Sequence, residues 1–146
     1  ISFQLRMLLE PYASSLAATR GDETLSTRLH ASNASMKKAI EANDIEAIQI
    51  ANRDFHNALI DASGSPRLRG ILKTMIDMPI IVRSFHLSST AENWQSLHHH
   101  EELTLAVDAR DGDLAKQVMH LHLRIAYLRF MAHRNVYQVA AQNSKL

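Results

Sequence analysis

Glycine and proline are scarce in this sequence, and this scarcity restricts the fold more than any other feature. The 146 residues contain only 4 glycines and 3 prolines, too few for the many tight turns of a β-sandwich or barrel. No window alternates apolar and polar residues in the manner of a half-buried strand, so we expect no strands. The sequence therefore predicts an all-α protein, an antiparallel bundle of about six helices joined by short connections.

The breaks between these helices are marked by residues that cap helices or turn the chain. Pro79 lies inside the fourth helical pattern and predicts a kink there, and we expect the tail after Asn135 to be frayed or only partly helical. The expected helices run from Phe3 to Ala18, from Asp22 or Thr24 to Asn43, from the cap Asp44 to Ser63, from Arg67 to about Leu87, from Ser88–Thr90 to Arg110, and from Asp111 or Asp113 to about Arg134.

Composition narrows the class of protein further. Cysteine is absent, which excludes disulfides and thiolate metal sites. Hydrophobic residues at 46% and charged residues at 21% are typical of one folded domain, here residues 1–146. The net charge of +1, without a block of like charges, argues against binding of nucleic acid by this chain alone. No apolar stretch reaches the ~20 residues of a membrane span, and no signal peptide is visible, so we expect a soluble, cytoplasmic protein.

Histidine is unusually frequent: the chain has nine, and five of them fall between His98 and His122. A histidine in a helical bundle has chemical significance when its helix face points inward. His56 lies in the apolar stripe of the third helix, with the amide of Asn52 one turn before it. His100 and His122 also have apolar neighbours at helical spacing. We therefore expect three histidines from three helices to point inward.

The remaining histidines of this region have different surroundings. His98 and His120 have charged or polar helical neighbours and are expected to face water, and His99 is intermediate. A buried imidazole needs partners for both ring nitrogens, and a shared divalent cation would supply one partner to each inward histidine. Zinc is the favoured cation, with nickel, iron or manganese as alternatives. Taken one by one, each histidine is alternatively a hydrogen-bonded core residue.

Segments from nearly the whole chain resemble, in the same order, the motifs of one known family. They are Leu5–Pro11 with Leu16–Ala18, Asn52–His56 with Ser63–Pro66, His100–Leu103 with Ala106 and Asp111, and Ala115 with Met119 and His122. The chain thereby resembles the FCD (FadR C-terminal) effector-binding domain of GntR-type bacterial transcriptional regulators. The resemblance implies a metabolite sensor that acts as a homodimer, with DNA bound through an N-terminal winged helix-turn-helix domain. Nothing here resembles that domain, and the chain opens at Ile1, so we expect it upstream.

The resemblance also implies a ligand set. In metal-binding members the corresponding positions coordinate a cation, and here these are Asn52, His56, His100 and His122. Asn52 stands where aspartate is commoner, and its neutral amide is a weaker ligand that leaves the site one charge more positive.

The expected effector is a small carboxylate metabolite bound at the open positions of the metal. A guanidinium is the natural partner for such a carboxylate. Arg6 and Arg83 are the candidates for this role. Arg6 alternatively pairs with Glu10 on the helix surface, and Arg83 is alternatively solvated.

Two other functions remain open. A three-histidine metal site is also compatible with a metal-dependent hydrolase, although we expect no inward acidic residue beside the ligands. Thr104 stands where the zinc-protease motif that begins at His100 requires its second histidine, and no histidine has a glutamate three residues before it, as a di-iron bundle requires. A helical interaction module with incidental histidines is the third possibility, and it would leave His56 and His122 exposed.

Overall fold

The computed structural model describes residues 2–76 and 88–143, and all regular structure in these ranges is helical. This confirms the predicted all-α fold. The helices are α1 (Ser2–Arg20), α2 (Glu23–Glu41), α3 (Ile45–Ala62), α4 (Pro66–Ile76), α6 (Thr90–Asp108) and α7 (Gly112–Asn143).

Local capping contacts fix where several of these helices begin. The side chains of Asp22, Asp44 and Asp111 accept hydrogen bonds from backbone N–H groups in the first turns of α2, α3 and α7. Ser89 and Glu92 form a reciprocal capping box at the start of α6. These contacts satisfy N–H groups that a helix leaves without internal partners, and they confirm the predicted helix starts.

The end of α7 differs from the prediction, and the end of α4 cannot be compared with it. The last helix continues to Asn143, beyond the expected end near Arg134, because no glycine or proline interrupts residues 113–143 and alanine and glutamine there favour helix. The helix α4 is described as far as Ile76. Pro79, with its expected kink, and Arg83 lie outside the described residues.

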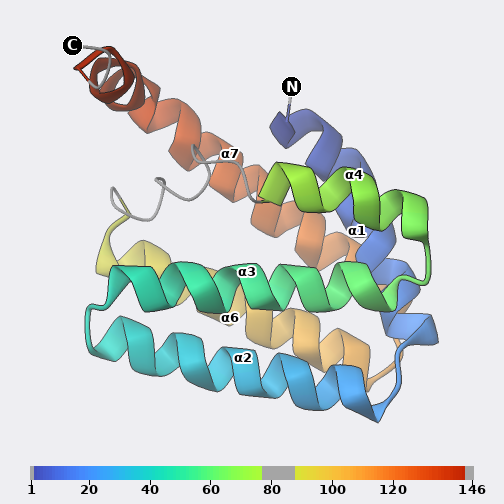
Figure 1. Ribbon diagram of the computed structural model, residues 1–146. Helices are drawn as coiled ribbons and strands as arrows, with labels where there is room; N and C mark the ends of the chain where they lie inside the picture. The colour runs from blue at the N-terminus through green and yellow to red at the C-terminus, as the bar shows by residue number, and fades with distance from the viewer. Residues whose placement is uncertain (1, 77–87, 144–146) are drawn as a thin grey trace.

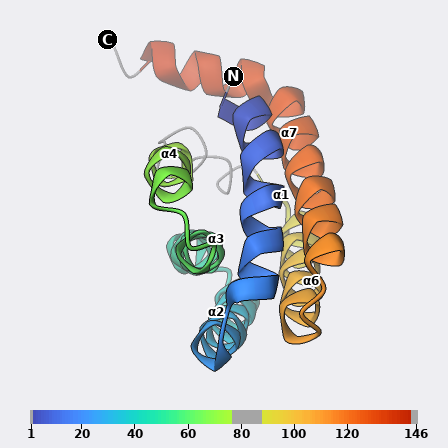
Figure 2. The same ribbon diagram turned by 90° about the vertical axis from the view of Figure 1, so that its right-hand side faces the viewer.

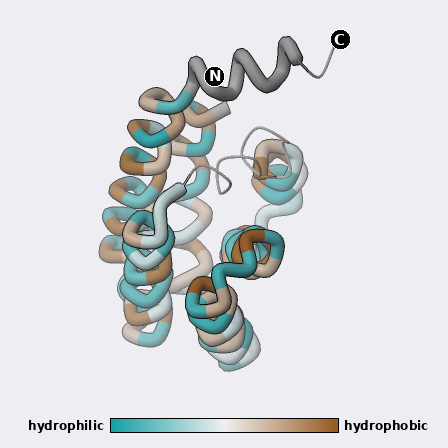
Figure 3. The backbone as a smooth tube through the Cα atoms, turned by 90° about the vertical axis from the view of Figure 1, so that its left-hand side faces the viewer, coloured by the Kyte–Doolittle hydropathy of each residue, from teal (hydrophilic) through white to brown (hydrophobic). Residues whose placement is uncertain are grey.

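The helices form a bundle in which α1 and α7 pack side by side in opposite directions (Figures 1 and 2). The pair α2 and α3 is also antiparallel, and α2 contacts α6 as well. The short α4 packs on α3 and α1. Hydrophilic and hydrophobic segments recur along each helix, as in amphipathic helices that share a core (Figure 3).

The main core lies where α1, α2, α3, α6 and α7 meet. Its central side chains are fully buried and include Leu29, Phe55, Leu103 and Met119. A second cluster fills the space between α2, α3 and α6, and a small third cluster attaches α4 to α3 and α1. In the described ranges, none of the helices combines the length and the apolar character that spanning a lipid bilayer requires.

Candidate metal centre

Three histidines from three helices meet inside the bundle. His56 of α3, His100 of α6 and His122 of α7 are 1%, 0% and 6% exposed. Their ring centroids lie 5.0 to 5.3 Å apart, and one ring nitrogen from each lies within 4.8 Å of the others. The structure therefore brings together the three histidines that the helix-face argument selected.

His100 is the residue whose surroundings point most directly to a missing partner. Its ring stacks flat on Phe55, with centroids 4.0 Å apart and planes at 3°. Within residues 2–76 and 88–143, neither ring nitrogen has a hydrogen-bond partner, although both are buried. An unsatisfied buried polar group costs about 1–3 kcal/mol, and a cation held between three imidazoles would remove that cost at one nitrogen. The donor set thus fits a divalent transition metal.

A buried carboxylate that the sequence argument missed adjoins this cluster. Glu10 of α1 is fully buried and accepts a hydrogen bond from Nδ1–H of His56 through Oε1. Its other oxygen, Oε2, accepts from Nε–H of Arg6 at 2.8 Å. Because the carboxylate fixes the proton of His56 on Nδ1, the lone pair of Nε2 is left for a cation.

The position of Glu10 corrects the expectation that no inward acidic residue lies beside the histidines. Arg6, Glu10 and Ser14 recur at every fourth position of α1 and are all buried. A polar stripe at this spacing is typical of a solvent-facing surface. The spacing of four residues can be seen in the sequence, and it places the three side chains on one face of α1. It does not show whether that face points toward the core or toward solvent.

The electrostatics of the centre follow from its burial. Burial by itself raises the pKa of Glu10, but the nearby Arg6 and His56 more than offset this effect and hold the pKa well below its ordinary value. Burial, together with the neighbouring imidazoles, lowers the pKa values of His100 and His122 well below the ordinary range. The carboxylate is therefore ionised and these two imidazoles are neutral, which is the form that ligates metals.

Asn52 is half-buried and lies one helical turn before His56. Among the described residues, no hydrogen bond joins its amide to a histidine, so its part as a fourth ligand stays a prediction. Arg6 does pair with Glu10, yet this pair lies inside the protein, at 5% and 0% side-chain exposure, rather than on the helix surface. Its contact with an effector also stays a prediction.

The other histidines of α6 and α7 divide by exposure. His98 and His120 are exposed, as expected. His99, expected to be intermediate, is buried at 6% exposure, because its ring turns toward α7. Its Nδ1 lies 3.0 Å from Nδ1 of His122.

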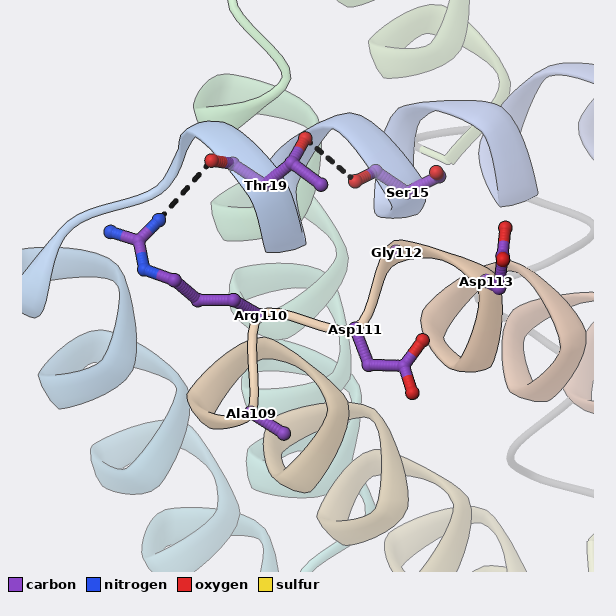
Figure 4. Close-up of a pocket in the computed structure, with 7 residues that line it drawn as sticks. All are labelled: Ser15, Thr19, Ala109, Arg110, Asp111, Gly112 and Asp113. Carbon is purple, nitrogen blue, oxygen red and sulfur yellow. Dashed lines mark hydrogen bonds between the residues drawn. The ribbon is translucent and has the colours of Figure 1, made fainter.

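A surface pocket of about 430 Å³ lies at the turn from α6 to α7, beside the end of α1 (Figure 4). Its lining includes Ser15, Thr19 and Arg110 but none of the clustered histidines. The guanidinium of Arg110 donates to the backbone oxygens of Thr19 and Gly21, each at 3.1 Å. We interpret this pocket as a junction between helices, separate from the histidine cluster.

Comparison with known proteins agrees with this architecture. Residues 2–125 match the FCD domain family. The structure resembles Streptococcus agalactiae GntR with a TM-score of 0.69 and 26% identity, over 88% of this chain and 56% of that one. It resembles E. coli McbR/YncC with a TM-score of 0.74 and 22% identity, over 88% of this chain and 64% of that one. No curated protein sequence matches the chain.

The chain thus spans less than two-thirds of the length of either solved structure. The likeness to McbR/YncC supports the helical architecture, and the family match includes all three histidines of the cluster. The resemblance seen in the sequence is confirmed: the chain belongs to the FCD domain family of GntR-type regulators.

Proposed function

We propose that this chain is the effector-binding domain of a GntR-family transcriptional regulator and that it binds a divalent transition metal through His56, His100 and His122. The observation that carries the proposal is His100, which is fully buried at the meeting point of three imidazoles. Neither of its ring nitrogens has a hydrogen-bond partner in the part of the chain that the structure describes. Packing alone gives no reason to keep such a residue there.

The chain's own residues would hold the metal as follows. His56 presents Nε2 because Glu10 occupies its Nδ1, and neutral His100 and His122 supply the other two nitrogens. Zinc is the favoured metal, with nickel, iron or manganese as alternatives. When bound, the metal supplies a Lewis-acidic point for an oxygen ligand. The amide of Asn52 is the nearest candidate in sequence for a further ligand, and its neutrality leaves the site more positive than aspartate would.

The positive charge of a metal site with the neutral Asn52 favours an anionic effector, and we propose a small carboxylate metabolite. Arg6 uses Nε for its bond to Glu10, and a guanidinium has further N–H donors with which to bind a carboxylate. Arg83 is proposed for the same role, although it lies outside the described residues.

The site joins several helices, so an effector bound there can regulate the protein by changing how these helices pack. The three histidines belong to α3, α6 and α7, and Glu10 connects them to α1. An effector that binds one packing of these helices better than another shifts the equilibrium between them, typically by about 1–3 kcal/mol. We propose that α1 transmits the shift to an N-terminal DNA-binding domain, and that the whole regulator is a cytoplasmic, bacterial homodimer.

The first test is the metal content of the purified domain. We expect about one equivalent of transition metal by elemental analysis after loading with zinc, and loss of that metal in His100→Ala. The matched control is His98→Ala, because His98 is the exposed neighbour of the buried His99 and His100 on the same helix. Failure of the unaltered domain to bind zinc, nickel, iron or manganese would overturn the metal site.

The second test addresses the effector. Thermal-shift measurements on the zinc-loaded domain with di- and tricarboxylates, hydroxy acids and sugar acids should reveal a ligand that raises Tm. The increase should vanish in His100→Ala and persist in His98→Ala. No response to any carboxylate, with zinc bound, would count against an acid effector.

The hydrolase alternative is less well supported by the site. Both oxygens of Glu10 are engaged, one by His56 and one by Arg6, so this carboxylate is not free to act as a general base. Turnover of an ester, phosphate or amide substrate that disappears in His100→Ala would reverse this conclusion.

A further inference from the structure

The buried ring of His99 makes a contact that the metal site proposed above does not use. His99 of α6 and His122 of α7 are each 6% exposed. Their Nδ1 atoms lie 3.0 Å apart, and their rings meet edge to face at 84°, with centroids 5.2 Å apart. Two ring nitrogens at this distance must share one proton, because two lone pairs or two N–H groups would repel each other.

The sharing of this proton determines the tautomer of His122. A neutral imidazole carries one N–H. If His122 donates from Nδ1, its Nε2 keeps a lone pair that can bind a cation. If His99 donates, Nε2 of His122 carries the proton and cannot bind one.

A comparable contact exists at another histidine of the cluster, His56. Glu10 accepts from Nδ1–H of His56 and thereby frees Nε2 of that ring. Glu10 of α1 contacts His56 of α3, and His99 of α6 contacts His122 of α7. Glu10 is ionised and can only accept, whereas Nδ1 of His99 accepts only when it carries no proton.

We propose that His99 is a positioning residue, whose unprotonated Nδ1 accepts the Nδ1–H of His122 and holds that ligand with Nε2 free for the metal. The inference rests on the metal site proposed above. Partners of this kind fix the orientation and tautomer of a ligating histidine, and their loss typically weakens metal binding by roughly 10- to 100-fold.

Three variants test the proposal. His99→Leu removes the acceptor, and His99→Asn keeps an amide oxygen close to the place of Nδ1. The matched control His98→Leu makes the same chemical change at the exposed neighbouring histidine. Competition with a chromophoric chelator should show zinc binding weakened by roughly 10- to 100-fold in His99→Leu. Affinity should be close to that of the unaltered domain in His99→Asn and His98→Leu.

A second readout does not depend on metal. Nitrogen NMR spectra of the imidazoles in the metal-free domain should show His122 protonated at Nδ1 and unprotonated at Nε2, and this preference should weaken in His99→Leu. The opposite tautomer in the unaltered domain, or unchanged zinc affinity in folded His99→Leu, would overturn the proposal. If the unaltered domain binds no zinc, nickel, iron or manganese, the proposed function fails, and the NMR tautomer still decides whether His99 accepts from His122.

Discussion

At the scale of single residues, Glu10 shows how the bundle accommodates a buried charge. It lies fully buried between a guanidinium and an imidazole, and each of its two oxygens accepts from one of them. A buried carboxylate is tolerable because both partners satisfy it. The three side chains therefore form one unit, and removal of the central member leaves two polar groups buried without their partner.

We expect Glu10→Ala to lower the free energy of unfolding by about 3–5 kcal/mol, the usual cost of leaving a buried charge unpaired. Glu10→Gln keeps the size of the side chain and should cost less. Urea denaturation of the metal-free domain measures both effects. Glu101→Ala, at an exposed position of α6, is the control and should change stability by less than about 0.5 kcal/mol. Equal stability of Glu10→Ala and the control would contradict the buried ion pair.

The neutral imidazoles of His100 and His122 predict a pH dependence of stability in the metal-free domain. Their pKa values are lowered well below 6.5 in the folded state, whereas in the unfolded chain they return to about 6.5. As the pH falls below about 6.5, the unfolded state binds protons that the folded state does not, so stability is lost. The slope approaches about 1.4 kcal/mol per pH unit for each residue.

Urea denaturation between about pH 5 and 8 with a chelator present measures this slope. His100→Leu should remove the contribution of His100 and reduce the slope, while His120→Asn, at an exposed position of α7, should leave the slope unchanged. Glu10 adds a separate loss only below its ordinary pKa of 4.5, outside the tested range. The same slope in His100→Leu as in the unaltered domain would show that His100 is not a buried neutral base.

At the scale of the helices, the sequence predicted those features that are determined locally. Capping residues such as Asp22 and Asp44 act within their own first turn, so the starts of α2 and α3 could be read from the chain. The end of α7 was misplaced because no residue there stops a helix. His56, His100 and His122 were identified because apolar neighbours mark their faces.

The features that the sequence could not supply depend on packing between helices. The polar stripe of Arg6, Glu10 and Ser14 has the appearance of a solvated face, and only the packing of α1 against α3 and α7 buries it. His99 is one residue from His100 and therefore lies on a different part of the α6 surface. It is buried because α7 approaches that side too, which no periodicity within α6 indicates.

The junction of α1 and α7 gives a prediction at this scale. A Cβ atom at Gly112, the first residue of α7, would lie 2.9 Å from Oγ and 3.1 Å from the backbone oxygen of Ser15, and 3.2 Å from Cγ2 of Thr19 (Figure 4). Gly112→Ala should therefore push α7 away from α1 and cost about 1–3 kcal/mol.

Gly70 of α4 provides the matched control, because a Cβ there meets no atom of the described residues within 4 Å. Gly70→Ala should stabilise the domain by about 0.4–1 kcal/mol, since alanine restricts the unfolded chain and favours helix. Thermal or urea denaturation should therefore show lower stability for Gly112→Ala and higher stability for Gly70→Ala. Equal effects would contradict the close approach of the two helices.

On the scale of the whole molecule, the histidine cluster with Glu10 takes its residues from four helices and none from α2 or α4. Of these last two, α2 packs into the main core and α4 does not. A cation would join α3, α6 and α7 directly, and α1 through Glu10. The helix α4 carries none of these residues and is attached through a small cluster that includes Ile60, Leu72 and Ile76. We therefore expect α4 to open locally without disruption of the metal site.

Hydrogen exchange tests this expectation. Zinc at 100 times its Kd should stabilise the native state by about 2.7 kcal/mol and slow amides that exchange by global unfolding about 100-fold. We expect this in the buried stretches around Phe55, Leu103 and Met119, with little change in Pro66–Ile76. His100→Ala should abolish the slowing everywhere. Equal slowing in α4 would mean that this helix unfolds only together with the core, and an effector signal could then spread through α4 as readily as through α1.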